Sequence, residues 1–256
     1  MKFFNKYPTV NYKFGTQSEI NQFTNLSVYA DVIDQVKDDA TAYQFYIVQD
    51  GERPDIVSHK LYGSEIYGWT FFILNDHIRD RGWPLGYQDF RDYLSVVLPG
   101  ECLVVNDTAV HSETGITVHT LTEKFPIGSS VYGSTTGAQG TVYQRNLNLG
   151  QLFVTKTGNI DFAAGETIND TLVGSPTYTA TLNSRSLAYR ATHHYLDSNG
   201  EYQDIDPTTG LNPSLYTEVT HEEFLEAENE GLSRIKVLRP GLINEFAALY
   251  KDTISR

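Results

Sequence analysis

The clearest pattern of apolar and polar positions begins with a strand. Phe45-Tyr-Ile-Val48 is rich in aromatic and β-branched residues, which favour strands, and the turn residues Gln49-Asp-Gly-Glu52 follow it directly. Pro54 suits the first turn of a helix, and Gly63 suits the left-handed position that ends one. The pattern therefore predicts a strand, a tight turn and a helix that runs up to this glycine.

Two further helices are predicted downstream. The first covers residues 65–74 and is stopped by Asn75-Asp76, and the second is an amphipathic segment, Tyr87 to Val97, broken by Pro99-Gly100. The apolar positions of the first two helices are expected to close a core against the strand, and they are Ile56, Leu61, Trp69, Phe72 and Ile73.

The chain before this region predicts an N-terminal extended arm over residues 1–44. It begins with an aromatic-rich extended piece, Phe3 to Phe14, and apolar residues at helical spacing predict a short helix from Phe23 to Val36. We assign residues 45–119 to the next module.

Residues 120–183 change character, because Gly, Thr and Ser separate short alternating runs that are typical of a small all-β unit. The segment also repeats itself. Phe125-Pro-Ile-Gly-Ser-Ser-Val131 and Phe162-Ala-Ala-Gly-Glu-Thr-Ile168 share one pattern of Phe, Gly and a β-branched residue. Two copies are too few for a solenoid, so we expect a pseudo-symmetric barrel or sandwich made of two similar hairpins.

Residues 184–256 return to mixed structure. Thr220-His-Glu-Glu223 has the spacing of a capping box, which predicts a helix that ends near Gly231. Arg234 to Leu238 alternates as a strand does, and Pro240 opens a last helix with a broad apolar face.

The charge of the chain is strongly segregated. The formal net charge is −13, which argues against nucleic acid as the main partner. From Asp197 to Gly231 there are ten acidic residues and no Lys or Arg, whereas residues 232–256 carry a net charge of +3. We expect the basic segment to pack on residues 45–98 and the acidic segment to face a neighbouring subunit, although a plain solvated helix face is the other reading.

A search for catalytic or metal-binding patterns gave no assignment. Cys102 lies in an apolar run, which favours a buried, unreactive thiol. His193 and His194 are adjacent on a predicted strand, so we expect their side chains to point to opposite faces. Asp204-Ile-Asp206 lacks the rest of a calcium loop, and no phosphate loop or nucleophile elbow is present. The sequence therefore predicts a protein that is not an enzyme and that needs no cofactor or metal.

The motif from Tyr46 to Gly63, followed by Leu74-Asn75, resembles a LysM module. The resemblance implies an α+β fold: a LysM-like βααβ module with an inserted small all-β domain and a C-terminal strand and helix that return to it. Glycan-binding members of that family carry a Gly-Asp-Thr-Leu turn, whereas this sequence has Gly51-Glu-Arg-Pro54 and an aromatic second helix. These differences weaken the case for sugar binding.

The same residues are similar to the baseplate wedge protein family of contractile-tailed phages, which includes gene product 53 of T-even-type phages. The similarity is carried by Gly51 to Gly63, Tyr67-Gly-Trp69 and Leu74-Asn-Asp76, with weaker matches at Phe4 to Tyr12 and at Leu232 to Phe246. It covers residues 1–98 and about 190–256, whereas residues 120–183 lie outside it.

This resemblance implies a structural subunit that joins neighbouring wedges around a sixfold baseplate. The implied partners are other baseplate wedge subunits and a sheath-initiator-like protein, and the implied place is the virion tail, assembled in the host cytoplasm. No apolar run is long enough for a membrane span, so no membrane partner is expected. The alternative is a LysM-type module that binds cell-wall glycan. The candidate interface consists of Tyr62, Tyr67, Trp69, Glu222, Glu226 and Glu230.

Overall fold

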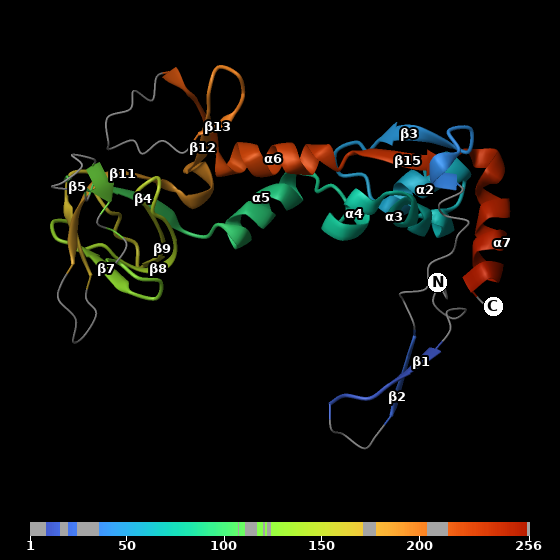
Figure 1. Ribbon diagram of the computed structural model, residues 1–256, viewed down its shortest axis with the longest axis horizontal. Helices are drawn as coiled ribbons and strands as arrows, with labels where there is room; N and C mark the ends of the chain where they lie inside the picture. The colour runs from blue at the N-terminus through green and yellow to red at the C-terminus, as the bar shows by residue number, and fades with distance from the viewer. Residues whose placement is uncertain are drawn as a thin grey trace. The chain divides into compact units, whose positions relative to one another are not determined.

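The computed structural model describes residues 9–15, 20–24, 36–106, 108–110, 117–119, 121, 124–170, 178–203 and 215–254 (Figure 1). The fold is mixed α+β. The chain divides into two compact units, the first made of Met1–Tyr87 with Glu228–Arg256 and the second of Gln88–Ala227. No helix among the described residues is long and apolar enough to cross a membrane.

The first unit contains a hairpin and a strand-helix module, in which two paired strands pack against helices. Strands β1 (Thr9–Tyr12) and β2 (Asn21–Thr24) pair antiparallel. The helix expected from Phe23 to Val36 is wrong at its start, because Phe23 lies in β2, and residues 25–35 lie outside the described residues. Most of the extended arm, including residues 1–8, is likewise outside them.

The module begins with β3 (Tyr43–Ile47) and continues through helical elements, α2 (Pro54–Tyr62), the 3-10 turn η2 (Glu65–Tyr67), α3 (Trp69–Leu74) and α4 (Asp76–Arg81). The predicted bounds of α2 are confirmed, because Pro54 opens it and Gly63 adopts φ 70° while its N–H donates to the His59 carbonyl. The predicted stop at Asn75 is half right. Helix α3 ends there, but α4 starts at the next residue.

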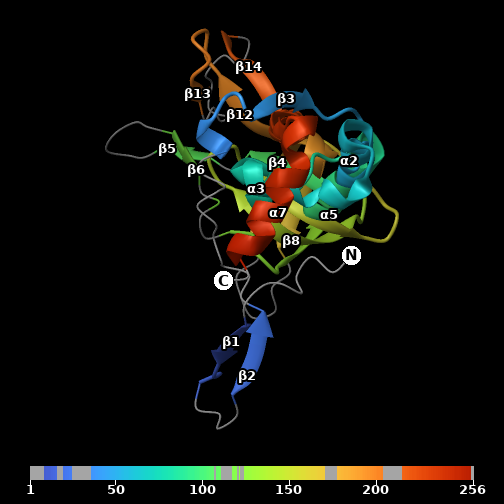
Figure 2. The ribbon, with the colours of Figure 1, turned by 90° about the vertical axis from the view of Figure 1, so that its right-hand side faces the viewer.

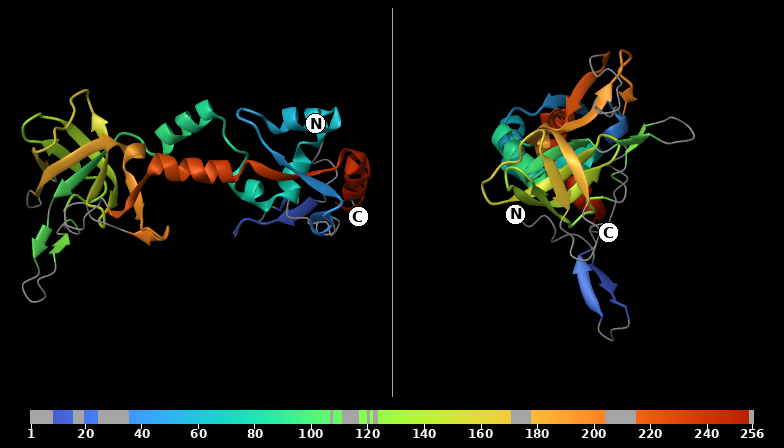
Figure 3. Two further views of the ribbon diagram at one scale, coloured as in Figure 1. Left: turned by 90° about the horizontal axis from the view of Figure 1, so that it is seen from above. Right: turned by 90° about the vertical axis from the view of Figure 1, so that its left-hand side faces the viewer.

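The second strand of this module comes from the other end of the chain. β15 (Arg234–Leu238) pairs antiparallel with β3, from Arg234 opposite Ile47 to Leu238 opposite Tyr43 (Figure 3). After the 3-10 turn η5 (Pro240–Leu242), α7 (Ile243–Ile254) packs its apolar face beside α3 (Figure 2). The C-terminal segment that was expected to return to residues 45–98 thus supplies a strand and a helix here.

The core of the module differs from the expected one by one helical position. Ile56 is 43% exposed, so its predicted place in the core is wrong, and the neighbouring Val57 is fully buried instead. A helix turns by about 100° per residue, so a one-residue error in phase moves a side chain to the rim of the apolar face. Leu61 and Phe72 are partly buried around a centre made by Val48, Val57, Phe71, Ile78, Ile235 and Val237. Ile73 is partly buried against a second cluster, made by Leu74, Leu238, Ile243, Phe246 and Tyr250.

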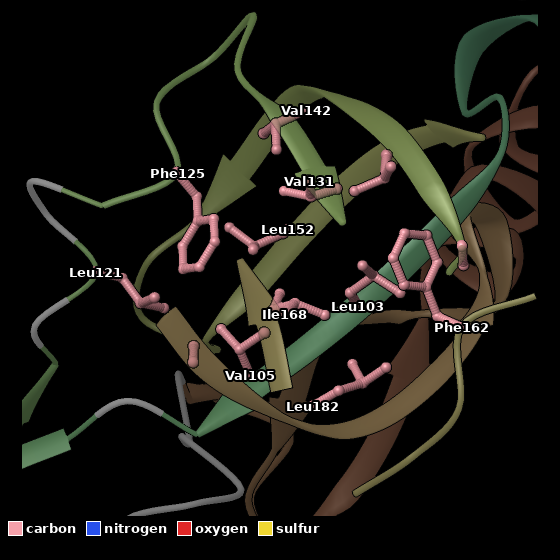
Figure 4. Close-up of a cluster of buried hydrophobic side chains, with 13 residues drawn as sticks. Leu103, Val105, Leu121, Phe125, Val131, Val142, Leu152, Phe162, Ile168 and Leu182 are labelled. Carbon is pink, nitrogen blue, oxygen red and sulfur yellow. The ribbon is translucent and has the colours of Figure 1, made fainter. Parts of the chain in front are cut away.

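The second unit is built around a closed six-stranded barrel with the order β10-β11-β4-β9-β8-β7, all pairs antiparallel. Its strands are β4 (Glu101–Asn106), β7 (Ser130–Gly133), β8 (Gln139–Asn146), β9 (Gln151–Thr157), β10 (Thr167–Asp170) and β11 (Thr179–Leu187). Alternate side chains fill its interior, as Figure 4 shows for Leu103, Phe125, Leu152 and Phe162. The barrel thus begins earlier in the chain than the expected boundary at residue 120, because β4 closes it.

The repeated motif forms equivalent hairpins in this barrel. Phe125 and Phe162 are both buried, and Gly128 and Gly165 have φ values of 91° and 87°. Each glycine N–H donates at 2.7 Å to a carbonyl on the second strand of its hairpin, that of Val142 in β8 or of Leu182 in β11. β7 and β10, which follow the two motifs, pair with each other around Tyr132 opposite Asn169, residues 37 apart like the motifs themselves. The two similar hairpins expected from the repeat are therefore confirmed, and the structure closes them into a barrel together with two further strands, β4 and β9.

Replacing either repeat glycine, Gly128 or Gly165, with Ala is expected to destabilise the barrel by about 1–2 kcal/mol, because an L-residue is strained at these φ values. An added Cβ meets no atom within 4 Å at either position, so steric overlap adds nothing. Denaturant unfolding of the two variants should give similar losses. A loss at one site and none at the other would contradict their structural equivalence.

The rest of the second unit adds helices and small sheets. α5 (Tyr87–Val97) has its predicted bounds, and β5 (Thr108–Val110) pairs with β6 (Thr117–His119). After the 3-10 turn η3 (Ala188–Arg190), β12 (Thr192–Leu196) pairs with β13 (Tyr202–Gln203) and β14 (Thr217–Thr220). The capping box is confirmed: Glu223 N–H donates to Thr220 Oγ1 at 3.2 Å, Thr220 N–H donates to the Glu223 carboxylate at 2.8 Å, and α6 (His221–Gly231) follows.

Candidate interaction surface

The three aromatic residues of the candidate interface lie together in the first unit, but they contact this chain's own C-terminal segment. The Tyr62 hydroxyl donates to the Leu238 carbonyl at 3.0 Å, and the Tyr67 hydroxyl donates to Asn244 Oδ1 at 2.6 Å. Burial raises the pKa of Tyr62. Trp69 is half-buried, with its ring 5.1 Å from that of Tyr250 and 6.3 Å from that of Phe246. These side chains therefore hold β15 and α7 against the module.

Asn75 also joins the module to β15, a role that the sequence pattern did not predict. It was read as a helix stop, but its buried side-chain amide also bridges to β15. Nδ2 donates to the carbonyls of Phe71 and Lys236, both at 2.8 Å, and Oδ1 accepts from the Lys236 N–H at 2.7 Å. The amide thus bonds one edge of β15 as a neighbouring strand would. The Leu74-Asn75 element of the motif was the available signal.

Within the turn that departs from the sugar-binding pattern, Glu52 is bonded inside the module, whereas the Arg53 side chain is 75% exposed. The Glu52 carboxylate is buried and accepts from the Tyr46 hydroxyl at 2.9 Å and the Gln49 N–H at 3.0 Å, and it pairs with Lys60. Burial raises the pKa of Glu52, but these hydrogen bonds outweigh it and hold the pKa below its ordinary value. Trp83 Nε1 donates to the Glu52 carbonyl at 2.6 Å. Glu52 thus uses its carboxylate and its backbone carbonyl to join the turn to the rest of the module.

The acidic candidates behave differently from one another. Glu222 is part of an internal ion pair with Arg91 on α5, with Arg190 at 3.9 Å, so its side chain is only 24% exposed. This contradicts the expectation that it faces outward. Glu226 and Glu230 lie on the exposed side of α6, and no described cation pairs with either. Only these two acidic candidates present free charge.

The two adjacent histidines lie on the same side of their strand, not on opposite faces. The β12–β14 register shifts between Thr192 and His194, so a bulge at His193 breaks the alternation that the expectation relied on. The two Nδ1 atoms are 2.8 Å apart, and His193 stacks on Phe224 at 4.1 Å. His221 joins them, with its ring 4.8 Å from that of His193. No group of residues in the described part of the chain could hold a metal ion.

Lowering the pH is expected to destabilise the second unit through His221. Burial, and then the neighbouring His193 and His194, lower its pKa to about 4, and in the unfolded chain the pKa returns to about 6.5. As the pH falls, the unfolded state therefore binds the proton before the folded state does. The contribution of neutral His221 to the free energy of unfolding is fully present above pH 6.5 and is lost as the pH drops towards 4. Urea unfolding at pH 7.5 and pH 5 should show this loss, and His221→Gln should reduce it. An unchanged pH dependence in the variant would contradict the assignment.

One apolar groove of about 270 Å³ lies in the first unit, between the segment before β3 and α7. Its lining residues are Val36, Asp39, Ala42, Leu238, Leu242, Glu245, Phe246 and Leu249. Leu242 and Leu249 are 38% and 48% exposed. The groove therefore lies beside the aromatic contacts of Phe246 and opens to the surface of the unit.

Asp204-Ile-Asp206 lies outside the described residues, so its geometry adds nothing to the candidate site. Cys102 is fully buried, and burial raises the pKa of its thiol, in keeping with the unreactive thiol that the sequence predicted.

In comparisons with known proteins, no protein-family model matches the chain and no curated protein matches it.

Proposed function

We propose that this protein is a structural subunit of a contractile-tail phage baseplate, where it joins neighbouring wedges during assembly. One observation carries the proposal beyond the sequence resemblance. The segments that resemble the wedge family, Gly51 to Asp76 and Leu232 to Phe246, are separated by about 150 residues, yet they form one packed module. The residues that join them include those that carry the resemblance, Trp69 and Asn75 among them.

The arrangement suits an assembly role for physical reasons. The aromatic residues of the module pack across its two distant segments, which gives it a core of its own. The barrel has a separate core, and a closed barrel has no free edge strands in its own ladder. The proposed partners are other wedge subunits and a sheath-initiator-like protein in a sixfold ring.

The LysM-type glycan-binding alternative has less physical support. A sugar-binding turn must present polar groups to solvent, whereas the Glu52 carboxylate is buried and bonded to Tyr46, Gln49 and Lys60. The purified protein is therefore expected not to sediment with peptidoglycan. Saturable binding that is lost when the Gly51 to Pro54 turn is replaced would favour the alternative instead.

The experiment that tests the proposal is removal of the gene from the phage that encodes it. Without the protein, wedges should form but fail to join into closed baseplates, and a plasmid copy should restore them. Electron micrographs and infectivity give the readout. Normal tails in the absence of the protein would overturn the proposal.

The exposed acidic pair offers a sharper variant. Glu226→Lys with Glu230→Lys should leave unfolding unchanged and reduce incorporation into tails, because no described cation pairs with either residue. Glu65→Lys with Glu201→Lys changes the net charge equally on other exposed sites and serves as the control. Glu222 is left intact, because reversing it would break its pair with Arg91.

A further inference from the structure

The two strands of the strand-helix module have very different outer edges. In an antiparallel pair, alternate residues turn their N–H and C=O groups towards the partner strand or away from it. The Val48 N–H donates to the Ser233 carbonyl at 2.9 Å, and the Arg239 N–H donates to the Ala42 carbonyl at 3.0 Å. Because both bonds fit the register of the ladder, Gln44 and Tyr46 face β15, and Tyr43, Phe45 and Ile47 face outward.

The outward groups of β15 are largely covered. Asn75 bonds both the N–H and the carbonyl of Lys236, and the Tyr62 hydroxyl bonds the carbonyl of Leu238. On the β3 side, the described residues supply one such contact, from Gln49 Nε2 to the Ile47 carbonyl at 2.9 Å. The outward N–H and carbonyl groups of Tyr43 and Phe45 have no partner in the described structure. Within the described part of the chain, β3 is thus an open edge strand.

β3 also lacks the features that usually protect such an edge. Natural edge strands carry charged residues, proline or a bulge that prevent pairing with another chain. Tyr43-Gln-Phe-Tyr-Ile47 contains no charge and no proline, and its register with β15 is unbroken. Phe45 and Ile47 are 52% and 61% exposed, on the face that points away from the helices. An apolar open edge of this kind is a template for an added strand.

The charges beside this edge indicate the chemistry of the added strand. The Arg234 guanidinium lies 4.2 Å from the centre of the Phe45 ring, and Lys236 Nζ lies 4.5 Å from the centre of the Tyr43 ring. Both cations therefore lie over β3, and Lys236 Nζ also donates to the Lys37 carbonyl at 3.4 Å. No described carboxylate pairs with either of them. A carboxylate on the same face of an incoming strand would meet this uncompensated positive charge.

We propose that β3 is a docking edge for an extended segment of another protein, which adds as a third strand and carries carboxylates at alternate positions. The added strand bonds the outward backbone groups of Tyr43, Phe45 and Ile47, and its acidic side chains face Arg234 and Lys236. This inference goes beyond the proposed baseplate role and does not depend on it, because it follows from the geometry of the edge and from the two cations beside it.

The test uses the full chain and a synthetic peptide of alternating Glu and Val with blocked ends. At millimolar concentration the peptide should slow amide exchange at Tyr43, Phe45 and Ile47, measured by NMR. A matched peptide with Lys in place of Glu should bind at least tenfold more weakly. Absence of protection at these amides, or equal binding of the two peptides, would overturn the proposal.

A proline substitution separates edge docking from general surface binding. Phe45→Pro removes an outward N–H and leaves the ladder to β15 intact, because Phe45 does not donate to β15. This variant should keep its fold, checked by circular dichroism, and lose the peptide. Phe45→Ala retains the N–H and should keep most of the binding. If instead the protein dimerises in sedimentation runs and Phe45→Pro abolishes the dimer, the occupant is a second copy and the acidic partner is wrong.

Discussion

Ending the chain at Ser233 is expected to unfold the first unit and to leave the barrel folded. The truncation removes β15 and α7, and with them six large buried side chains, Ile235, Val237, Leu238, Ile243, Phe246 and Tyr250. Each buried side chain of this size contributes about 1.5–3 kcal/mol, so the loss is roughly 10 kcal/mol or more. That equals the whole stability of a typical domain.

Limited proteolysis with mass spectrometry should show the difference directly. Residues 36–87 should become sensitive to protease, whereas residues 101–187 should stay protected. A chain that ends at Asp252 keeps every one of those six side chains and serves as the control. Survival of a protected fragment from β3 to α4 in the truncated chain would contradict the view that the two distant segments form one folding unit.

Phe71→Ala is expected to lower the free energy of unfolding of the module by about 3–5 kcal/mol, as is typical of a large side chain removed from a core. Phe71 is fully buried, with its ring 6.2 Å from that of Tyr62 and 5.8 Å from that of Trp83. Trp69→Ala should cost less, because Trp69 is only half-buried.

The matched control for Phe71 is Ile56→Ala. Ile56 is 43% exposed, so its loss should be below about 1 kcal/mol. Denaturant unfolding followed by tryptophan fluorescence measures both variants, since Trp83 contacts Phe71. A larger loss of unfolding free energy for Ile56→Ala than for Phe71→Ala would show that Ile56 belongs to the core, as the sequence predicted.

The elements that could be predicted from the sequence are those whose ends carry local signals. Pro54 and Gly63 define α2, and the Thr220–Glu223 box opens α6, because these residues satisfy or replace backbone groups at helix ends. The repeated motif predicted the two hairpins of the barrel because its glycines adopt the positive φ that these turns require. Local chemistry was sufficient in each case.

The features that were missed depend on contacts between distant residues. β4 belongs to the barrel only through its pairing with β9 and β11, which begin 50 or more residues later. The bulge at His193 depends on the register with β14, and Glu222 is neutralised by Arg91, 131 residues away. The open edge of β3 likewise follows only once β15 is known to be its partner strand. A short window of sequence contains only one of the two partners in each of these contacts, so it could not predict them.

A reconstruction, by electron cryo-microscopy, of the contractile tail in which we propose that this protein resides tests the proposed function most directly. The account predicts density in the baseplate that fits the strand-helix module and, separately, the six-stranded barrel, in a sixfold arrangement between adjacent wedges. Absence of both from the baseplate, or their placement on a fibre tip that contacts the cell wall, would contradict it.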